Sequence, residues 1–254
     1  MLLDFDLDFV LAVMLISIRV GAIFLLTPLF SIGNIPVRIR VFLTVALSLM
    51  FVLLLKDQHI FRSISVNELF EIAVYEAFFG LMLAFGVFAA FATFNFGGRM
   101  LDYQMGFGIA SLVDPVTHNQ DPLLGTILNM MAVMVFYLVD GHHLLIKGLL
   151  YSFEVFPPGA MISYMPIDEI IKQFGAIFTF GLGLVAPVVF VLFLLDVALA
   201  VAARTMPQVN MFIISIPIKI FVGLSVLAIS IAYFAPLLTK IYMSIFQYWQ
   251  SILG

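Results

Sequence analysis

The sequence predicts an all-α fold made of hydrophobic helical hairpins, with no β-sheet. Of its 254 residues, 64% are hydrophobic and only 10% are charged, and the mean hydropathy is +1.20. The apolar residues fall into long runs, and a helix needs roughly 20 of them to cross the hydrocarbon core of a bilayer. A soluble domain has no surface that could hide this composition. We therefore expect a membrane protein whose surroundings are lipid, other protein or both.

Six apolar segments are long enough, or nearly so, for membrane-length helices, and they form one predicted domain over residues 1–254. The segments lie at roughly residues 9–30, 39–55, 69–96, 123–139, 174–203 and 211–238. The aspartates of MLLDFDLDFV stand where a cleavable signal peptide would carry positive charge, so we expect the first segment to be retained. Between the fourth and fifth segments, residues 140–169 are expected to form a loop.

Several classes of function can be excluded from the composition. The net charge of −4 and the lack of a basic cluster argue against nucleic-acid binding, and the chain has no cysteine. The stretch GFGIAS lacks the third glycine of a dinucleotide loop. His142 and His143 are adjacent, so on a helix their rings should point about 100° apart, and we expect no metal there. No cofactor is predicted.

Charged residues lie inside the apolar segments, namely Arg19, Glu71, Glu76, Asp196 and Lys219. A charge at mid-bilayer costs at least about 2.5 to 3.5 kcal/mol on insertion scales, so each must face protein or water. Small residues recur at helical spacing, which favours close helix packing; they are Ala73, Ala77, Gly80 and Ala84, and then Ala198 and Ala202. We expect Arg19 and Lys219 to pair with carboxylates or carbonyls at helix interfaces.

Asp196 is a lone acid deep in the fifth segment, and such a residue is a candidate for proton or ion movement. Arg204 lies two turns further on about the same face. An ion-pair network at a helix interface is the simpler interpretation, because a proton relay normally needs more than one acid along its path. Charge counting gives no orientation, since the predicted connections on the two sides carry similar numbers of Lys and Arg.

The segment from Arg99 to Pro122 is irregular but apolar at its centre. Glycines and two Asp-Pro steps prevent it from continuing as a regular helix. Irregular backbone at membrane depth is tolerated only where it is buried in protein or lines a water-filled cavity. We therefore predict a channel plug or gate that contains Met105, Gly106, Phe107, Gly108, Ile109, Leu112, Val113, Asp114 and Pro115.

Four sequence blocks, which follow one another in a fixed order along nearly the whole chain, indicate a resemblance to a known family. The blocks are Arg19 and Pro28 with IPVRIR; LDYQMGFGIASLVDP; DGHHLLIKGLLYSFEVFPPG; and APVVFVLFLLDVALAVAARTMPQVNMFIISIPIKIFVGL. With them the chain resembles the FliR-type family of type III secretion export-gate proteins. Asp196 departs from the family pattern, in which a neutral polar residue is expected at this position. The sequence GFGIASLVDP resembles the flagellar members of the family more than the virulence ones.

The resemblance implies a non-catalytic subunit of a flagellar export gate. Its implied partners are the sister subunits FliP and FliQ, other export-apparatus membrane proteins such as FlhB, unfolded protein substrates and membrane lipid. The implied location is the bacterial inner membrane at the flagellar basal body, with much of the assembled subunit above the bilayer on the periplasmic side. The resemblance also places the loop that matches DYQMGFGIASLVDP inside the conduit, where it helps to close it.

Two alternatives from other classes stay open. A secondary transporter would use Asp196, Glu76 and Arg19 for ion coupling, but such a protein should show internal pseudo-symmetry with paired broken helices, and none is visible. An intramembrane enzyme would need two or more convergent titratable groups at workable spacing, and the sequence shows no such motif.

Overall fold

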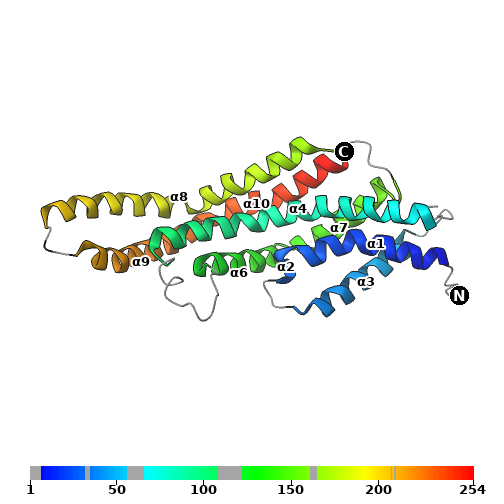
Figure 1. Ribbon diagram of the computed structural model, residues 1–254, viewed down its shortest axis with the longest axis horizontal. Coiled ribbons are helices and arrows are strands. Elements are labelled where there is room, and N and C mark those ends of the chain that lie inside the picture. Colours follow the sequence, from blue (N-terminus) through cyan, green and yellow to red (C-terminus); the bar gives the residue numbers. More distant parts are fainter. Residues whose placement is uncertain are drawn as a thin grey trace. The chain divides into compact units, whose positions relative to one another are not determined.

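The computed structural model describes residues 7–31, 35–55, 66–107, 122–160, 165–206, 208 and 210–254. Within these ranges every regular element is a helix (Figure 1), so the predicted all-α class is confirmed. The helices are α1 (Leu7–Leu26), α2 (Pro28–Ser31), α3 (Val37–Leu54), α4 (Val66–Met105), α6 (Leu123–Leu138), α7 (Gly141–Val155), α8 (Ile167–Thr205), α9 (Met211–Ser230), the 3-10 turn η1 (Ile231–Tyr233) and α10 (Phe234–Leu253).

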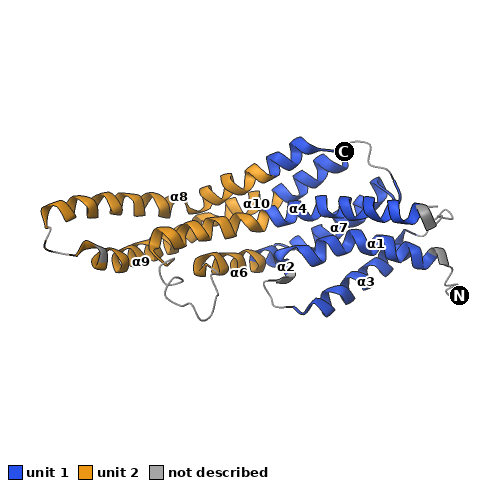
Figure 2. Ribbon diagram, viewed as in Figure 1, with its two compact units in different colours: residues 1–89, 135–173, 244–254 blue, residues 90–134, 174–243 orange. Residues whose placement is uncertain are grey.

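The chain divides into two compact units (Figure 2). Unit 1 comprises residues 1–89, 135–173 and 244–254, and unit 2 comprises residues 90–134 and 174–243. Each of the four boundaries falls inside a helix, in α4, α6, α8 and α10 respectively. The expectation of a single domain over residues 1–254 stays a prediction.

In unit 1, α1 packs against both α3 and α4. The backbone of α1 comes so close to Gly80 of α4 that a Cβ there would lie 3.0 Å from the Arg19 carbonyl oxygen and 2.9 Å from Ala22 Cβ. The end of α10 is fixed to α4 by two buried donors: Tyr248 Oη donates to the Met82 carbonyl (3.2 Å) and Trp249 Nε1 donates to the Leu83 carbonyl (2.9 Å). Small residues and buried aromatic donors therefore hold this unit together.

In unit 2, α4 crosses α6 and α8 at glycines. A Cβ on Gly98 would overlap the backbone of Gly125 in α6, and a Cβ on Gly97 would lie 3.1 Å from the Gly181 carbonyl oxygen in α8. On α10, the Tyr242 hydroxyl donates to the Ala132 carbonyl of α6 at 2.6 Å. Only residues without side chains allow backbones to approach this closely.

Two boundaries predicted from the sequence are wrong. The third segment was expected to end near residue 96, yet α4 continues through Gly97, Gly98 and Arg99 to Met105. The glycines serve helix crossing here, and the helix ends one residue before Gly106, whose φ of +87° favours glycine. The sixth segment was expected to end near residue 238, but helix continues through α10 to Leu253.

The loop predicted over residues 140–169 is also wrong, because it contains α7. Gly141, the two histidines and Gly148 lower helix propensity, but the buried face of α7 repeats every three or four residues and overrides it. Its buried members are Gly141, Leu145, Leu149, Ser152 and Phe153.

Among the described residues, five helical stretches are long and apolar enough to cross a membrane, and the bent pair of α6 and α7 could be a sixth span. The pair is bent by 72° at its break. In an 18-residue apolar window of α4, 67% of the residues are buried inside this chain, whereas the corresponding windows of the α8 stretch and of the α9 to α10 stretch have 22% and 17% of their residues buried. The surfaces of α8 and α9 must therefore be covered by lipid or by another protein.

The close approach at Gly98 generates the first prediction. Gly98→Ala should lower the thermal stability of the detergent-solubilised chain, because the new methyl group would collide with backbone atoms of Gly125 that cannot rotate away. Overpacking of this kind costs about 1 to 3 kcal/mol. The matched control is Gly183→Ala in α8, where a Cβ meets nothing within 4 Å. There the substitution should be neutral or slightly stabilising, since alanine favours helix. Equal melting temperatures for the two variants would contradict the glycine crossing.

Candidate functional site

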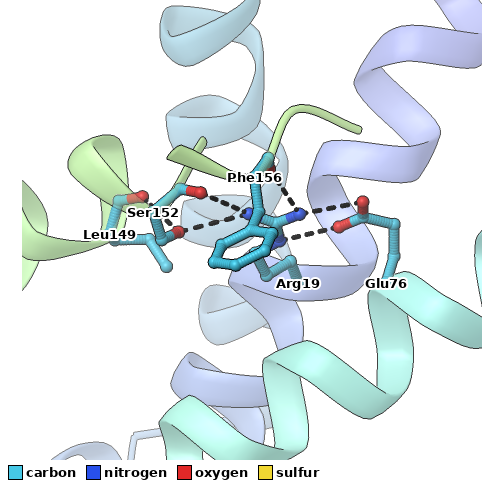
Figure 3. Close-up of polar contacts among 5 residues, drawn as sticks. All are labelled: Arg19, Glu76, Leu149, Ser152 and Phe156. Atoms are coloured by element: carbon cyan, nitrogen blue, oxygen red, sulfur yellow. Dashed lines mark hydrogen bonds and ion pairs between the residues drawn. The ribbon is translucent and has the colours of Figure 1, made fainter. Parts of the chain in front are cut away.

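A buried charge centre lies where α1, α4 and α7 meet in unit 1 (Figure 3). Arg19 of α1 forms a two-pronged ion pair with Glu76 of α4, with Nε 2.7 Å from Oε2 and Nη2 2.9 Å from Oε1. Its Nη1 donates to the Ser152 carbonyl (3.0 Å) and hydroxyl (3.3 Å), and Nη2 also donates to the Phe156 carbonyl (3.0 Å). These contacts match the five N–H groups of a guanidinium.

Aromatic rings cover the faces of this guanidinium. Arg19 Cζ lies 4.6 Å from the centre of the Phe79 ring and 4.2 Å from that of Phe153. The Arg19 and Glu76 residues are each 2% exposed. The pair thus satisfies the condition for burying charge in an apolar segment, in which the opposite charges and all the hydrogen-bond donors meet partners inside the protein.

A second ion pair joins α8 and α9 in unit 2. Lys219 Nζ lies 2.5 Å from Asp196 Oδ1, with the two side chains 21% and 39% exposed. Arg19 and Lys219 therefore each lie against a carboxylate of a neighbouring helix. Asp196 thus takes part in an ion pair at a helix interface, while Arg204 is exposed and makes no ion pair within the described part of the chain. Lys219 lies on the neighbouring helix α9, so its contact with Asp196 could not be predicted from residue spacing along α8.

The base of the predicted plug is held by a residue that the sequence analysis missed. Asp102 in α4 is 5% exposed, and its carboxylate accepts hydrogen bonds from the backbone N–H groups of Leu124 (3.1 Å) and Gly125 (3.4 Å) at the start of α6. The first N–H groups of a helix have no partner within the helix, so an acid is favourable there. The sequence did contain a signal for this residue, because Asp102 is an acid inside an apolar run, four residues after Gly98.

The described residues on either side of positions 108–121 thus lie in one packed region of unit 2. Met105, the last residue of α4, is fully buried, and its side chain fills the space beside Gly223 of α9. Gly106 and Phe107 follow as a turn and are half-buried. Of the nine predicted plug residues, Gly108, Ile109, Leu112, Val113, Asp114 and Pro115 lie outside the described residues.

These helices and paired charges define a helical membrane protein in which several of the described helices are long and apolar enough to span a bilayer. A family model, described as bacterial export proteins, family 1, matches residues 10–245. The chain belongs to this family.

Individual relatives agree with this assignment. The chain is 32% identical to the flagellar biosynthetic protein FliR of Bacillus subtilis over 88% of its own length and 87% of the relative. It is 28% identical to the Escherichia coli protein of the same name, over 93% of its own length and 90% of the relative. It is 27% identical to the Yop proteins translocation protein T of Yersinia pestis, over 57% of its own length and 56% of the relative. Both types of relative are similar to this chain, and the flagellar ones match more of it.

The difference in burial between the two ion pairs generates the second prediction. Arg19→Leu should cost about 3 to 5 kcal/mol of stability, because Glu76 would stay buried without its counter-charge. Lys219→Leu should cost less, since Asp196 is 39% exposed and can be solvated. Thermal melting and assembly yield of the detergent-solubilised variants measure the difference, and the double variant Arg19→Leu with Glu76→Leu should recover part of the loss. Equal yields for Arg19→Leu and the parent would contradict the prediction.

The third prediction concerns Asp102. Asp102→Ala should speed hydrogen exchange of the Leu124 and Gly125 amides, because these N–H groups lose their acceptor. Losing buried hydrogen bonds to a charged group costs about 1.5 to 3 kcal/mol. The control is Arg99→Ala on the same helix, where an exposed side chain bonds only locally to Asn95 at 2.8 Å. Unchanged exchange at the start of α6 in Asp102→Ala would show that the carboxylate does not hold it.

Proposed function

We propose that this chain is a non-catalytic subunit of a flagellar type III protein export gate. It forms part of the channel wall, and the loop that follows α4 closes the channel to unfolded substrates at rest. The single observation that carries the plug is the anchoring of both loop ends, by Asp102 on the start of α6 and by Met105 against Gly223.

The anchored base supports a plug for a mechanical reason. A loop that blocks a conduit must hold its ends still while its middle moves aside. Buried hydrogen bonds and a glycine crossing fix the ends, and Gly106 at φ +87° provides the turn from which the loop departs. The residues that would seal are apolar, and a hydrophobic constriction resists water and ions by dewetting.

The exposed apolar surface of unit 2 supports assembly with other subunits. Several large apolar side chains of α8 and α9 lie open in the single chain, including Phe190 (62% exposed), Phe193 (58%) and Phe221 (75%). On the same helices the ion pair of Asp196 and Lys219 is partly exposed. A lipid-facing surface would not favour charged groups, whereas a protein partner can satisfy them. We propose FliP and FliQ as these partners, with FlhB and further membrane proteins of the apparatus nearby.

The same argument bears on location. We propose an inner-membrane site at the flagellar basal body, with much of the assembled subunit above the bilayer on the periplasmic side. Charged residues inside apolar helices, and Lys and Arg counts that give no orientation, are what such a placement would produce. The flagellar system is favoured over its virulence counterpart, because the flagellar relatives match 88% and 93% of the chain against 57% for the translocation protein.

The charge geometry does not favour a secondary transporter. Ion coupling needs a carboxylate that the ion or proton can reach and leave. Glu76 is 2% exposed and both its oxygens are bound to Arg19. Asp196 is bound to Lys219. Both acids are therefore satisfied by cations of the same chain.

The plug is the fourth prediction. Deleting residues 106–113 should leave assembly with the partner subunits intact, because Asp102 and Met105 stay in place, yet should make the membrane permeable to small ions or dyes. Gly108→Pro should reduce export, because proline stiffens the loop. Dye influx and secretion into the medium are measured in cells that express each variant beside the parent.

Tyr233→Ala is the control, since this side chain is 75% exposed in η1 and outside the loop. It should neither leak nor impair export. If the deleted form assembles normally and no leak appears, the loop is not the seal.

A further inference from the structure

Three side chains of the types that bind metal ions lie close together at the break between α6 and α7. One ligand atom from each of Asp140, His142 and His143 can be chosen so that all three lie within 4.8 Å of one another. The two imidazole rings have centres 4.1 Å apart. The expectation that these rings diverge by about 100° is therefore wrong, and with it the reason for rejecting a metal here.

The backbone at the break produces this arrangement. Asp140 has φ 56° and ψ 26°, a left-handed conformation that aspartate tolerates better than most residues. It makes no side-chain cap on α7, and its Oδ1 lies 3.2 Å from His143 Nδ1. The carboxylate thus turns toward the histidines instead of the helix N–H groups.

His142 is the fixed member of the group. Its ring centre lies 5.3 Å from that of Tyr137, and the residue lines an apolar cavity of about 200 Å³ together with Phe136 and Leu145. Its Nδ1 is buried and has no hydrogen-bond partner among the described residues. A buried ring nitrogen without a partner is costly, and a bound cation is one way to satisfy it.

Asp140 and His143 are the adjustable members, because their side chains are 73% and 64% exposed. Tetrahedral zinc with bonds of about 2.0 to 2.1 Å places its ligand atoms about 3.3 Å apart. The three ligand atoms lie at most 4.8 Å apart, and the two exposed side chains have solvent around them in which to close that distance. The helix dipole at the start of α7 opposes a cation, and the Asp140 carboxylate offsets it.

We infer that Asp140, His142 and His143 form a binding site for a divalent transition-metal ion of the zinc class. Two imidazoles and one carboxylate are a donor set that binds zinc with a fourth position left for water. The bound ion joins the residue before α7 to the first turn of that helix, and so fixes the break between α6 and α7. This inference is independent of the proposed export function.

The test is metal binding by the full-length chain, purified in detergent with an affinity tag that contains no histidine. Zn²⁺ is measured by elemental analysis after dialysis, and Co²⁺ is titrated as a spectroscopic substitute and displaced with Zn²⁺. We expect one ion per chain, and an upward shift of the melting temperature with Zn²⁺. Asp140→Asn and His143→Gln should each weaken binding at least tenfold and remove the melting shift. His142→Gln should do the same.

The control uses the other two histidines of the chain: His59→Gln with His118→Gln should bind Zn²⁺ like the parent. If His142→Gln fails to fold, as judged by circular dichroism, the two exposed positions decide the outcome. Absence of Zn²⁺ binding in the parent would overturn the inference. So would binding that all three site variants retain, because the ion would then lie elsewhere.

Discussion

The burial of Arg19 is the constraint on which the packing of unit 1 depends. An arginine inside an apolar helix has to find an acid and enough acceptors within the protein, since lipid offers neither. Glu76 provides the acid from α4, while Ser152 and Phe156 provide acceptors from α7 and the residue after it. One side chain therefore fixes the register of three helices, with contacts to residues 57 and 133 positions further along the chain.

The rest of the packing follows a rule suited to apolar surroundings. Helices in lipid gain little from the hydrophobic effect against each other, so close backbone contact and a few polar bonds determine which faces meet. Glycines supply the contact at Gly80 and Gly98. Buried donors and acceptors supply the bonds, with Trp249 reaching the Leu83 carbonyl and Asp102 reaching the start of α6. Apolar side chains fill the space between, but many kinds of apolar residue could do so.

The sequence allowed the class of fold to be predicted, because long apolar runs have few other structures available to them. It also indicated that Arg19 and Lys219 need carboxylates or carbonyls as partners, although it did not identify which ones. It grouped Asp196 with Arg204 and not with Lys219, because spacing along one helix says nothing about the residues of the helix beside it. The loop expected at residues 140–169 was wrong because glycine and histidine lower helix propensity locally, whereas the buried face of α7 is set by tertiary packing. Asp102 stands out in the sequence as an acid inside an apolar run, but its role was missed because its partners are backbone N–H groups, which no residue type identifies.

The wide spacing of the Arg19 contacts along the chain also has a consequence for biosynthesis. Glu76 is made 57 residues after Arg19. At about 5 to 20 residues per second, the nascent α1 waits roughly 3 to 11 s for its counter-charge. The α7 acceptors at Ser152 arrive later still. During that interval α1 carries a cation without the counter-charge that it has in the folded chain. The set of contacts around Arg19 is therefore complete only after more than half of the protein has been synthesised.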